Sequence, residues 1–213
     1  MIPGPNYIYK CPNCPNLLYR GSLVSGNTFG AKLYSDGKQE APMLPEFPSI
    51  TQCPKCKTIF WIDKVKEVGE MDVWDRNENP QWKDVKRAEF LPIQQYFTAI
   101  ENKLYDSENE EIFIRLRIWW SFNDRVRKGK PLFKNEHEET QWLENVHGLL
   151  RLFDPADVSH RIMTAELYRN MGQFDKCKEV LSSISDSKFD WLTKKFISEC
   201  DKGNNMVFEL KNA

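Results

Sequence analysis

The sequence predicts an α+β chain in which a small β-rich part is followed by an all-α part. Residues 1–65 hold most of the prolines, half of the glycines and two Cys-x-x-Cys pairs, and no helical period runs through them. From about residue 92 onward, apolar residues recur with a period near 3.6, which is typical of amphipathic helices. We therefore expect domains over 1–65 and 88–213, joined by a polar connector over 66–87.

Composition narrows the class of protein. The 213 residues are 40% hydrophobic and 29% charged, as in ordinary globular chains, and the formal net charge is −1. Such a balance gives no overall field to attract nucleic acid or an acidic membrane. No apolar run approaches the ~18 residues of a membrane span, and the first residues lack the pattern of a signal peptide. We expect a cytoplasmic protein without a membrane partner.

The N-terminal part shows strand signals. Runs rich in β-forming residues occupy 16–20, 28–34 and 57–62, and Asp36-Gly37 is a hairpin-turn signal. A segment this short, and interrupted by so many turn residues, cannot be stabilised by apolar burial alone. It needs an additional cross-link, which a metal ion would supply. The polar stretch 66–87 contains Val73, Trp74 and Trp82, and we expect it to lie on the surface of the second domain.

Six helices are expected in the second part. Their boundary signals are Pro92 at the first, Ser107 with Glu110 as a capping box at the second, Asn135 with Glu138 at the third, Asp154-Pro155 before the fourth, Gly172 after the fourth and Gly203 after the sixth. The fifth helix runs between Phe174 and Ile184. The tail 206–210 is apolar and is expected either to fold back onto the helices or to leave room for a partner.

The second helix carries apolar residues on two faces. Ile112 and Trp119 share one face, while Ile118 and Phe122 share another, so this helix is expected to lie between neighbours. Asn123 falls within the first apolar face. Since buried polar groups are hydrogen-bonded, we interpret Asn123 as a buried structural amide with partners.

Four of the six cysteines form two pairs. Cys11 and Cys14 form the first pair, Cys53 and Cys56 the second. Disulfides would need an oxidising compartment, for which the chain gives no signal. A reactive redox pair would sit at a helix N-terminus, whereas strand-like residues follow both pairs here. The favoured interpretation is one metal ion held by four thiolates.

These Cys-Pro-x-Cys turns resemble the paired knuckles of a zinc ribbon, over about residues 7–65. Two residues between cysteines make a tight turn whose backbone N–H groups point at the first sulfur. The resemblance implies a closed Zn²⁺ site of four cysteines that staples the fold and does no chemistry.

Two departures from the ribbon pattern have consequences. The 38 residues between Cys14 and Cys53 exceed the usual interval, so an extra hairpin must lie between the knuckles. Pro15 and Lys57 follow the second cysteines, where ribbons and rubredoxins commonly carry glycine. The absence of these glycines argues more against a rubredoxin-like iron site than against a zinc site.

One segment of the helical part resembles a tetratricopeptide repeat. The residues at the family's spacings are Ala165, Tyr168, Gly172 and Phe174, with Cys177 where a small residue is usual. The match covers about 30 residues, a single unit. Carried over by position, it implies groove-facing side chains at Glu166, Arg169 and Asn170 that would contact a protein or peptide partner. The alternative for these three is an ordinary solvated helix face.

No catalytic constellation is present in the sequence. Glu144-x-x-His147 lacks the second such motif of a di-iron site, and neither a glycine-rich phosphate loop nor a Gly-x-Ser-x-Gly motif occurs. We therefore expect no enzyme but a zinc-binding interaction module that docks a protein segment on its helical half. The alternative is a nucleic-acid-binding ribbon, since 1–65 hold seven Lys/Arg against four Asp/Glu. Tight phosphate binding normally needs a denser basic stripe.

Overall fold

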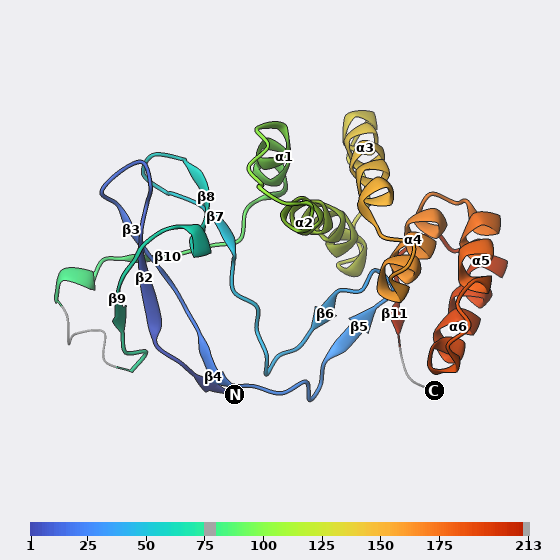
Figure 1. The fold of residues 1–213 in the computed structure, drawn as a ribbon, viewed down its shortest axis with the longest axis horizontal. Helices are drawn as coiled ribbons and strands as arrows, with labels where there is room; N and C mark the ends of the chain where they lie inside the picture. The colour runs from blue at the N-terminus through green and yellow to red at the C-terminus, as the bar shows by residue number, and fades with distance from the viewer. Residues whose placement is uncertain (75–79, 211–213) are drawn as a thin grey trace. The chain divides into compact units, whose positions relative to one another are not determined.

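The computed structural model describes residues 1–74 and 80–210, and its strands followed by six helices confirm the α+β class (Figure 1). The chain forms two compact units, each from two segments. Unit 1 comprises Met1–Ala31 and Glu40–Leu104, and unit 2 comprises Lys32–Gln39 and Tyr105–Ala213. No helix within the described part of the chain is long and apolar enough to cross a membrane.

Short strands dominate unit 1. They are β1 (Ile2–Pro3), β2 (Asn6–Lys10), β3 (Leu17–Arg20), β4 (Leu23–Ser25), β7 (Ile50–Gln52), β8 (Ile59–Trp61), β9 (Glu67–Met71) and β10 (Lys86–Arg87), with 3₁₀ turns η1 (Ile62–Lys64) and η2 (Pro80–Trp82) and helix α1 (Ile93–Glu101).

Helices dominate unit 2. They are α2 (Glu108–Arg127), α3 (Glu136–Leu152), α4 (Val158–Asn170), α5 (Phe174–Ser182) and α6 (Asp190–Asp201), with a 3₁₀ turn η3 (Ser187–Phe189) and strands β5 (Lys32–Tyr34) and β11 (Glu209–Leu210). Strand β6 (Gln39–Glu40) lies where the chain passes back into unit 1.

A four-stranded sheet with the order β10-β3-β2-β9 organises unit 1. β2 pairs antiparallel with β3 and with β9, while β10 pairs parallel with β3. Ile8 of β2 and Leu18 of β3 are buried. The sequence analysis identified β3 but missed β2, whose short run Tyr7-Ile8-Tyr9 lies close to prolines on both sides, Pro5 and Pro12.

The expected connector 66–87 is part of this sheet, and its interpretation as a surface strip of the second domain was wrong. It supplies β9 and β10, the two outer strands. Trp82 packs on β9, where a Cβ built on Gly69 would lie only 2.2 Å from its ring carbon Cη2. Trp74 is 82% exposed. Residues 75–79 of the expected connector lie outside the described residues.

Helix α1 also belongs to unit 1, whereas the sequence analysis assigned it to the helical domain. It begins after Pro92, as expected. Trp61 of β8 donates a hydrogen bond from Nε1 to the carbonyl oxygen of Leu104, at 2.7 Å. This bond ties the end of the α1 segment to the knuckle strands, so the boundary between units follows Leu104 rather than the connector.

The hairpin expected between the knuckles is present but belongs to unit 2. β5 and β6 flank the turn at Asp36-Gly37, where Gly37 adopts a positive φ of 75°. The expected strand over 28–34 is shortened to β5. The tail strand β11 pairs antiparallel with β5, so the chain's end folds back onto unit 2.

Asp36 lies at the centre of a buried polar network against α2. Its carboxylate accepts hydrogen bonds from Asn123 Nδ2 at 2.8 Å and from the guanidinium of Arg127, and its carbonyl accepts one from Trp120 Nε1 at 3.0 Å. Asn123 is therefore the satisfied buried amide that the sequence predicted. Residues on both expected apolar faces of α2 are buried, which confirms that this helix lies between neighbours.

The helix caps agree with the sequence at two positions and differ at one. Ser107 and Asn135 accept hydrogen bonds from the backbone N–H groups of Glu110 and Glu138. The cap of α4 is Asp157, which accepts from the N–H of His160 at 2.9 Å, and not Asp154-Pro155. Asp157 is one turn nearer to the apolar residues that define the helix.

We predict that Gly69→Ala destabilises unit 1 by about 1–3 kcal/mol, because the added Cβ collides with Trp82. Denaturant unfolding would measure the effect. In a Trp82→Ala background the same substitution should cost much less, since the colliding ring is absent. Equal costs in both backgrounds would contradict the packing of Trp82 on β9.

We also predict a pH dependence from Glu199 of α6. Hydrogen bonds from Asn204 and Lys202 lower its pKa from 4.5 to about 2. A lowered carboxyl pKa stabilises the fold above the ordinary pKa, and this contribution is lost as the pH falls toward the lowered value. Glu199→Gln should therefore reduce the free energy of unfolding at neutral pH by roughly 1–2 kcal/mol and flatten its slope at acidic pH. The exposed Glu179→Gln is the control and should change neither.

Candidate metal centre

The two cysteine pairs lie in matching turns of unit 1. Cys11 and Cys14 lie between β2 and β3, and Cys53 and Cys56 lie between β7 and β8. Each turn is closed by a backbone hydrogen bond from its first cysteine, to the carbonyl of Asn16 at 2.9 Å and to the carbonyl of Thr58 at 2.8 Å. The two turns thus share the same closing hydrogen bond.

The fold brings all four sulfur atoms together, to within 4.8 Å of one another. Cys11 Sγ lies 3.5 Å from Cys56 Sγ, and Cys14 Sγ lies 3.7 Å from Cys53 Sγ. A tetrahedral ion with metal–sulfur bonds of about 2.3 Å needs sulfur–sulfur edges of about 3.8 Å. The donor set therefore fits a tetrahedral metal ion that prefers thiolates.

The environment differs between the sulfurs. Burial raises the pKa of the Cys11 thiol to about 12, although the backbone N–H of Asn13 hydrogen-bonds to its sulfur. The hydroxyl and the backbone N–H of Thr58 hold the pKa of the Cys56 thiol at about 6. The N–H of Asn13 points at the first sulfur of its knuckle, as the spacing predicts. Thr58 carried no sequence signal, because its role depends on the turn that follows Cys56.

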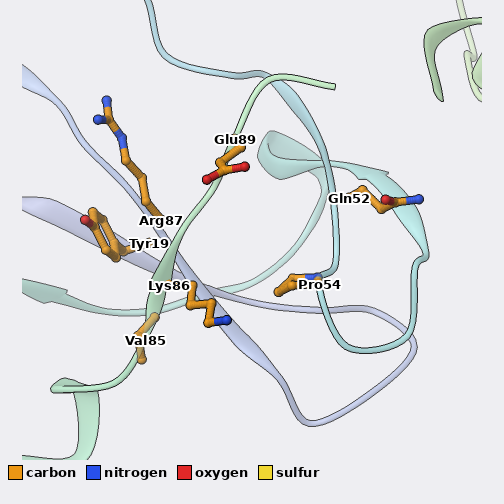
Figure 2. A pocket seen from close by; sticks show the side chains of 7 residues that line it. All are labelled: Tyr19, Gln52, Pro54, Val85, Lys86, Arg87 and Glu89. Atoms are coloured by element: carbon orange, nitrogen blue, oxygen red, sulfur yellow. The ribbon is translucent and has the colours of Figure 1, made fainter. Parts of the chain in front are cut away.

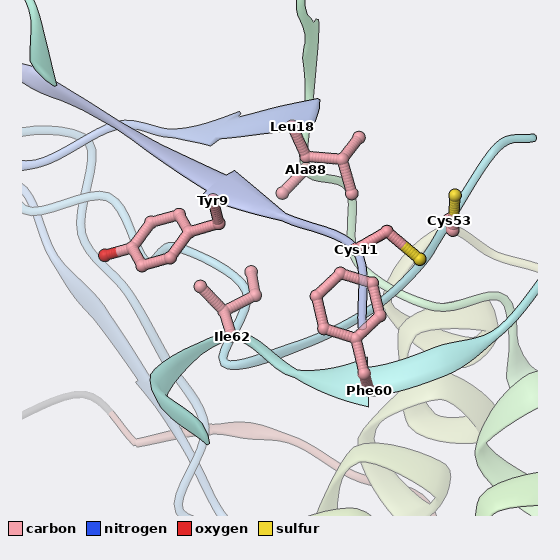
Figure 3. Close-up of a cluster of buried hydrophobic side chains, with 7 residues drawn as sticks. All are labelled: Tyr9, Cys11, Leu18, Cys53, Phe60, Ile62 and Ala88. Atoms are coloured by element: carbon pink, nitrogen blue, oxygen red, sulfur yellow. The ribbon is translucent and has the colours of Figure 1, made fainter. Parts of the chain in front are cut away.

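Apolar side chains enclose the inner half of the cluster (Figure 3). Cys11 and Cys53 are buried, while Cys14 and Cys56 are half-buried. The buried side chains of the same group are Tyr9, Leu18, Phe60, Ile62 and Ala88. The thiols therefore form part of the core of unit 1, and bringing them together completes it.

Lys57 occupies the position at which the sequence departs from the glycine of zinc ribbons. Its φ is +62°, in the left-handed region that favours glycine. Its N–H donates to the carbonyl of Cys53 at 2.9 Å, which fixes the turn in this conformation. The backbone thus has the form that a glycine would adopt, with a lysine in its place.

The cluster is the one metal-competent group of three or more His, Cys, Asp or Glu side chains found within residues 1–74 and 80–210. Four cysteines complete a tetrahedral shell and leave no position for water or substrate. Chemically, such a centre can hold an ion and cross-link the two turns. Cys177 and Cys200 are separate from it, buried 3.5 Å apart between α5 and α6, where burial raises the pKa of both thiols.

The three candidate partner residues do not face a free groove. Glu166 and Arg169 have no exposed surface, and Asn170 is 6% exposed. Glu166 receives hydrogen bonds from Arg169 at 2.6 and 2.7 Å and from the hydroxyl of Ser35 at 2.7 Å. Both interpretations of these residues, a partner groove and a solvated face, were wrong, because the hairpin and the tail of unit 2 cover them.

The tail occupies the place that a peptide partner would have taken. Arg169 donates to the carbonyls of Asn204 and Met206, and Asn170 donates to the carbonyl of Asn205 at 3.0 Å. Phe208 packs on Arg169 with 4.7 Å between guanidinium carbon and ring centre. The groove is therefore filled from within the chain.

Comparison with known proteins gives no relative, since no family model, no curated protein and no solved structure matches the chain. The resemblances to zinc ribbons and to a tetratricopeptide repeat therefore rest on their motifs and on the geometry of the cysteines.

We predict that Lys57→Gly raises the stability of unit 1 by about 1 kcal/mol, because it removes the cost of a left-handed side-chain-bearing residue. Thermal unfolding of the metal-loaded protein measures the change. Lys55→Gly in the same knuckle is the matched control. Lys55 has no positive φ, so its replacement should destabilise slightly through backbone entropy. Equal effects of the two substitutions would contradict the interpretation.

Proposed function

We propose that the chain binds one Zn²⁺ through Cys11, Cys14, Cys53 and Cys56, that the ion is structural, and that the protein is a non-enzymatic interaction module. The observation that carries the proposal is the convergence of four thiols from two separate turns within 4.8 Å. A metal ion would supply the cross-link that so small a set of strands needs.

A structural role is supported by the closed donor set. Catalytic zinc sites use three protein ligands and keep a fourth position for water, whereas sites with four cysteines are structural. Half of the sulfurs are buried among apolar side chains, where a substrate would not reach them. The ion would accordingly hold the knuckles together and leave binding to other surfaces of the chain.

Zinc is favoured over iron by the residues around the cysteines, since a tetrahedron of four thiolates suits both ions. Lys57 and Pro15 stand where rubredoxin-like iron knuckles carry glycine. An iron centre of this kind would act by exchanging electrons with a partner. No feature of the four-cysteine cluster points to such a partner.

The proposed partner is a protein segment rather than nucleic acid. The counts of basic and acidic residues in the whole chain are 30 and 31, so no sequence-wide charge draws a polyanion to it. A zinc ion with four thiolates adds two further negative charges. Nucleic acid binding by the ribbon stays the alternative, and a steep fall of affinity with salt would reveal it.

The test is the metal content of the purified protein and of two variants. We predict one zinc ion per chain, its loss in Cys53→Ser, and its retention in Cys177→Ala, which removes a buried cysteine outside the cluster. In Cys53→Ser, unit 1 should unfold while most helical circular dichroism remains, since the helices of unit 2 have their own core.

Several outcomes would contradict the proposal. Iron in place of zinc, or a folded protein that holds no metal without exposure to a chelator, would overturn the metal assignment. A loss of helical signal in Cys53→Ser would show that the two units unfold together. Metal release should also follow acidification, because each thiolate that holds the ion must then take up a proton.

A further inference from the structure

A hollow of about 440 Å³ lies beside strand β10 in unit 1. Figure 2 shows Val85, Lys86 and Arg87 of the β10 segment on one side and Gln52 and Pro54 of the second knuckle on the other. Tyr19 of β3 and Glu89 complete the lining. Its volume falls in the range of ligand sites, and most of its lining is polar.

Two adjacent cations, Lys86 and Arg87, border this hollow. Lys86 and Arg87 are exposed, and neither forms an ion pair or a side-chain hydrogen bond with any other described residue. In Figure 2 the side chain of Lys86 extends toward Pro54, while that of Arg87 rises beside Tyr19. Successive side chains of a strand point to opposite faces, so the two charges cover both faces of β10.

The backbone of β10 is also incompletely paired. β10 is an outer strand, parallel to β3, with Lys86 opposite Leu18 and Arg87 opposite Tyr19. The N–H of Ala88 donates to the carbonyl of Tyr19 at 2.7 Å. In a parallel ladder of this register, the backbone groups of Lys86 and Ala88 form the hydrogen bonds with β3. The backbone N–H and C=O of Arg87, the residue between them, therefore point away from β3. They bond to no described residue.

We propose that this edge docks an extended acidic segment of a partner protein. One residue of the segment pairs with the N–H and C=O of Arg87, as in strand addition to a sheet edge. Its two adjacent carboxylates reach Lys86 and Arg87, one on each face of the strand. This inference rests on the proposed interaction function and names the class of partner and its place on the chain.

The observations favour an acidic peptide over other occupants. A second copy of β10 would place lysine and arginine opposite like charges, which is destabilising. A DNA backbone offers phosphate oxygens that accept from the N–H of Arg87, but it has no donor for the C=O of Arg87. Two adjacent cations also contact fewer phosphates than a nucleic-acid-binding surface normally does. Glu89 limits where the acidic residues of the partner can lie, because it repels them at the far end of the hollow.

The test uses the full-length zinc-loaded protein and fluorescence anisotropy. The probe is a labelled hexapeptide with two central glutamates flanked by valine and threonine. Its comparators are the same peptide with two lysines and a short oligothymidylate. We expect saturable binding of the acidic peptide alone. The double variant Lys86→Glu with Arg87→Glu should weaken it roughly tenfold. Lys83→Glu reverses an exposed charge that does not line the hollow and should leave binding unchanged.

A second pair of variants tests the backbone contact. Arg87→Ala removes the charge, while Arg87→Pro removes the charge and the outward N–H. Proline is tolerated on an edge strand where its nitrogen faces away from the ladder. Arg87→Pro should bind the acidic peptide a few-fold more weakly than Arg87→Ala. If Arg87→Pro loses its zinc through misfolding, the charge-reversed variant and its Lys83→Glu control decide the question.

Three results would overturn the inference. They are tighter binding of oligothymidylate than of the acidic peptide, equal binding by the charge-reversed variant, and no binding up to millimolar peptide. Zinc content is measured on the same samples. One zinc per chain without peptide binding would overturn the docking inference and leave the metal proposal standing, whereas absence of zinc would overturn the metal proposal by itself.

Discussion

The convergence of two distant cysteine pairs is the constraint on which unit 1 depends. Cys14 and Cys53 are separated by 38 residues, yet their sulfurs lie 3.7 Å apart. The strands described in this unit are at most five residues long. Two of the thiols fill part of the core themselves. A small set of strands buries little apolar surface, so burial alone contributes little folding free energy. A metal ion bound by both cysteine turns would add the free energy of binding to that of folding.

Unit 2 differs from unit 1 in that it buries charged side chains. Its hairpin and tail are short and partly polar. The Asp36–Arg127 pair holds the hairpin against α2, while the Glu166–Arg169 pair within α4 binds the hydroxyl of Ser35 in the hairpin and the carbonyls of Asn204 and Met206 in the tail. A buried pair costs desolvation and adds little net stability, but removing one partner leaves an unpaired charge inside the unit. These pairs therefore fix where hairpin and tail lie. The same side chains that a repeat-like groove would offer to a partner are thereby used within the chain.

The sequence predicted what local chemistry controls. Six helices, the turn at Asp36-Gly37, the buried Asn123 and the four-cysteine cluster all follow from periodicity, turn residues or spacing. It could not predict which unit receives a segment. The hairpin at 32–39 and helix α1 were assigned by chain order, whereas the contacts of Asp36 and Trp61 decide their place. β9 and β10 were missed because β10 is a dipeptide of two cations and β9, with its two apolar residues three positions apart, shows no apolar alternation. Glu166, Arg169 and Asn170 were misjudged because burial of a charged side chain depends on partners far along the chain.

The closed metal centre and the open sheet edge are complementary features of unit 1. Four thiolates would leave a bound ion no position for a ligand, so the proposed centre would supply rigidity rather than recognition. β10 is short and carries two cations, which is how proteins keep an outer strand from pairing with copies of itself. That protection is selective, because it works through charge: it repels a basic strand and attracts an acidic one. Since Pro54 of the second knuckle lines the hollow beside β10, the turn that carries Cys53 and Cys56 also forms one wall of the hollow. Removal of the proposed metal should thus weaken the proposed docking at β10 by moving that wall, without any contact between partner and metal.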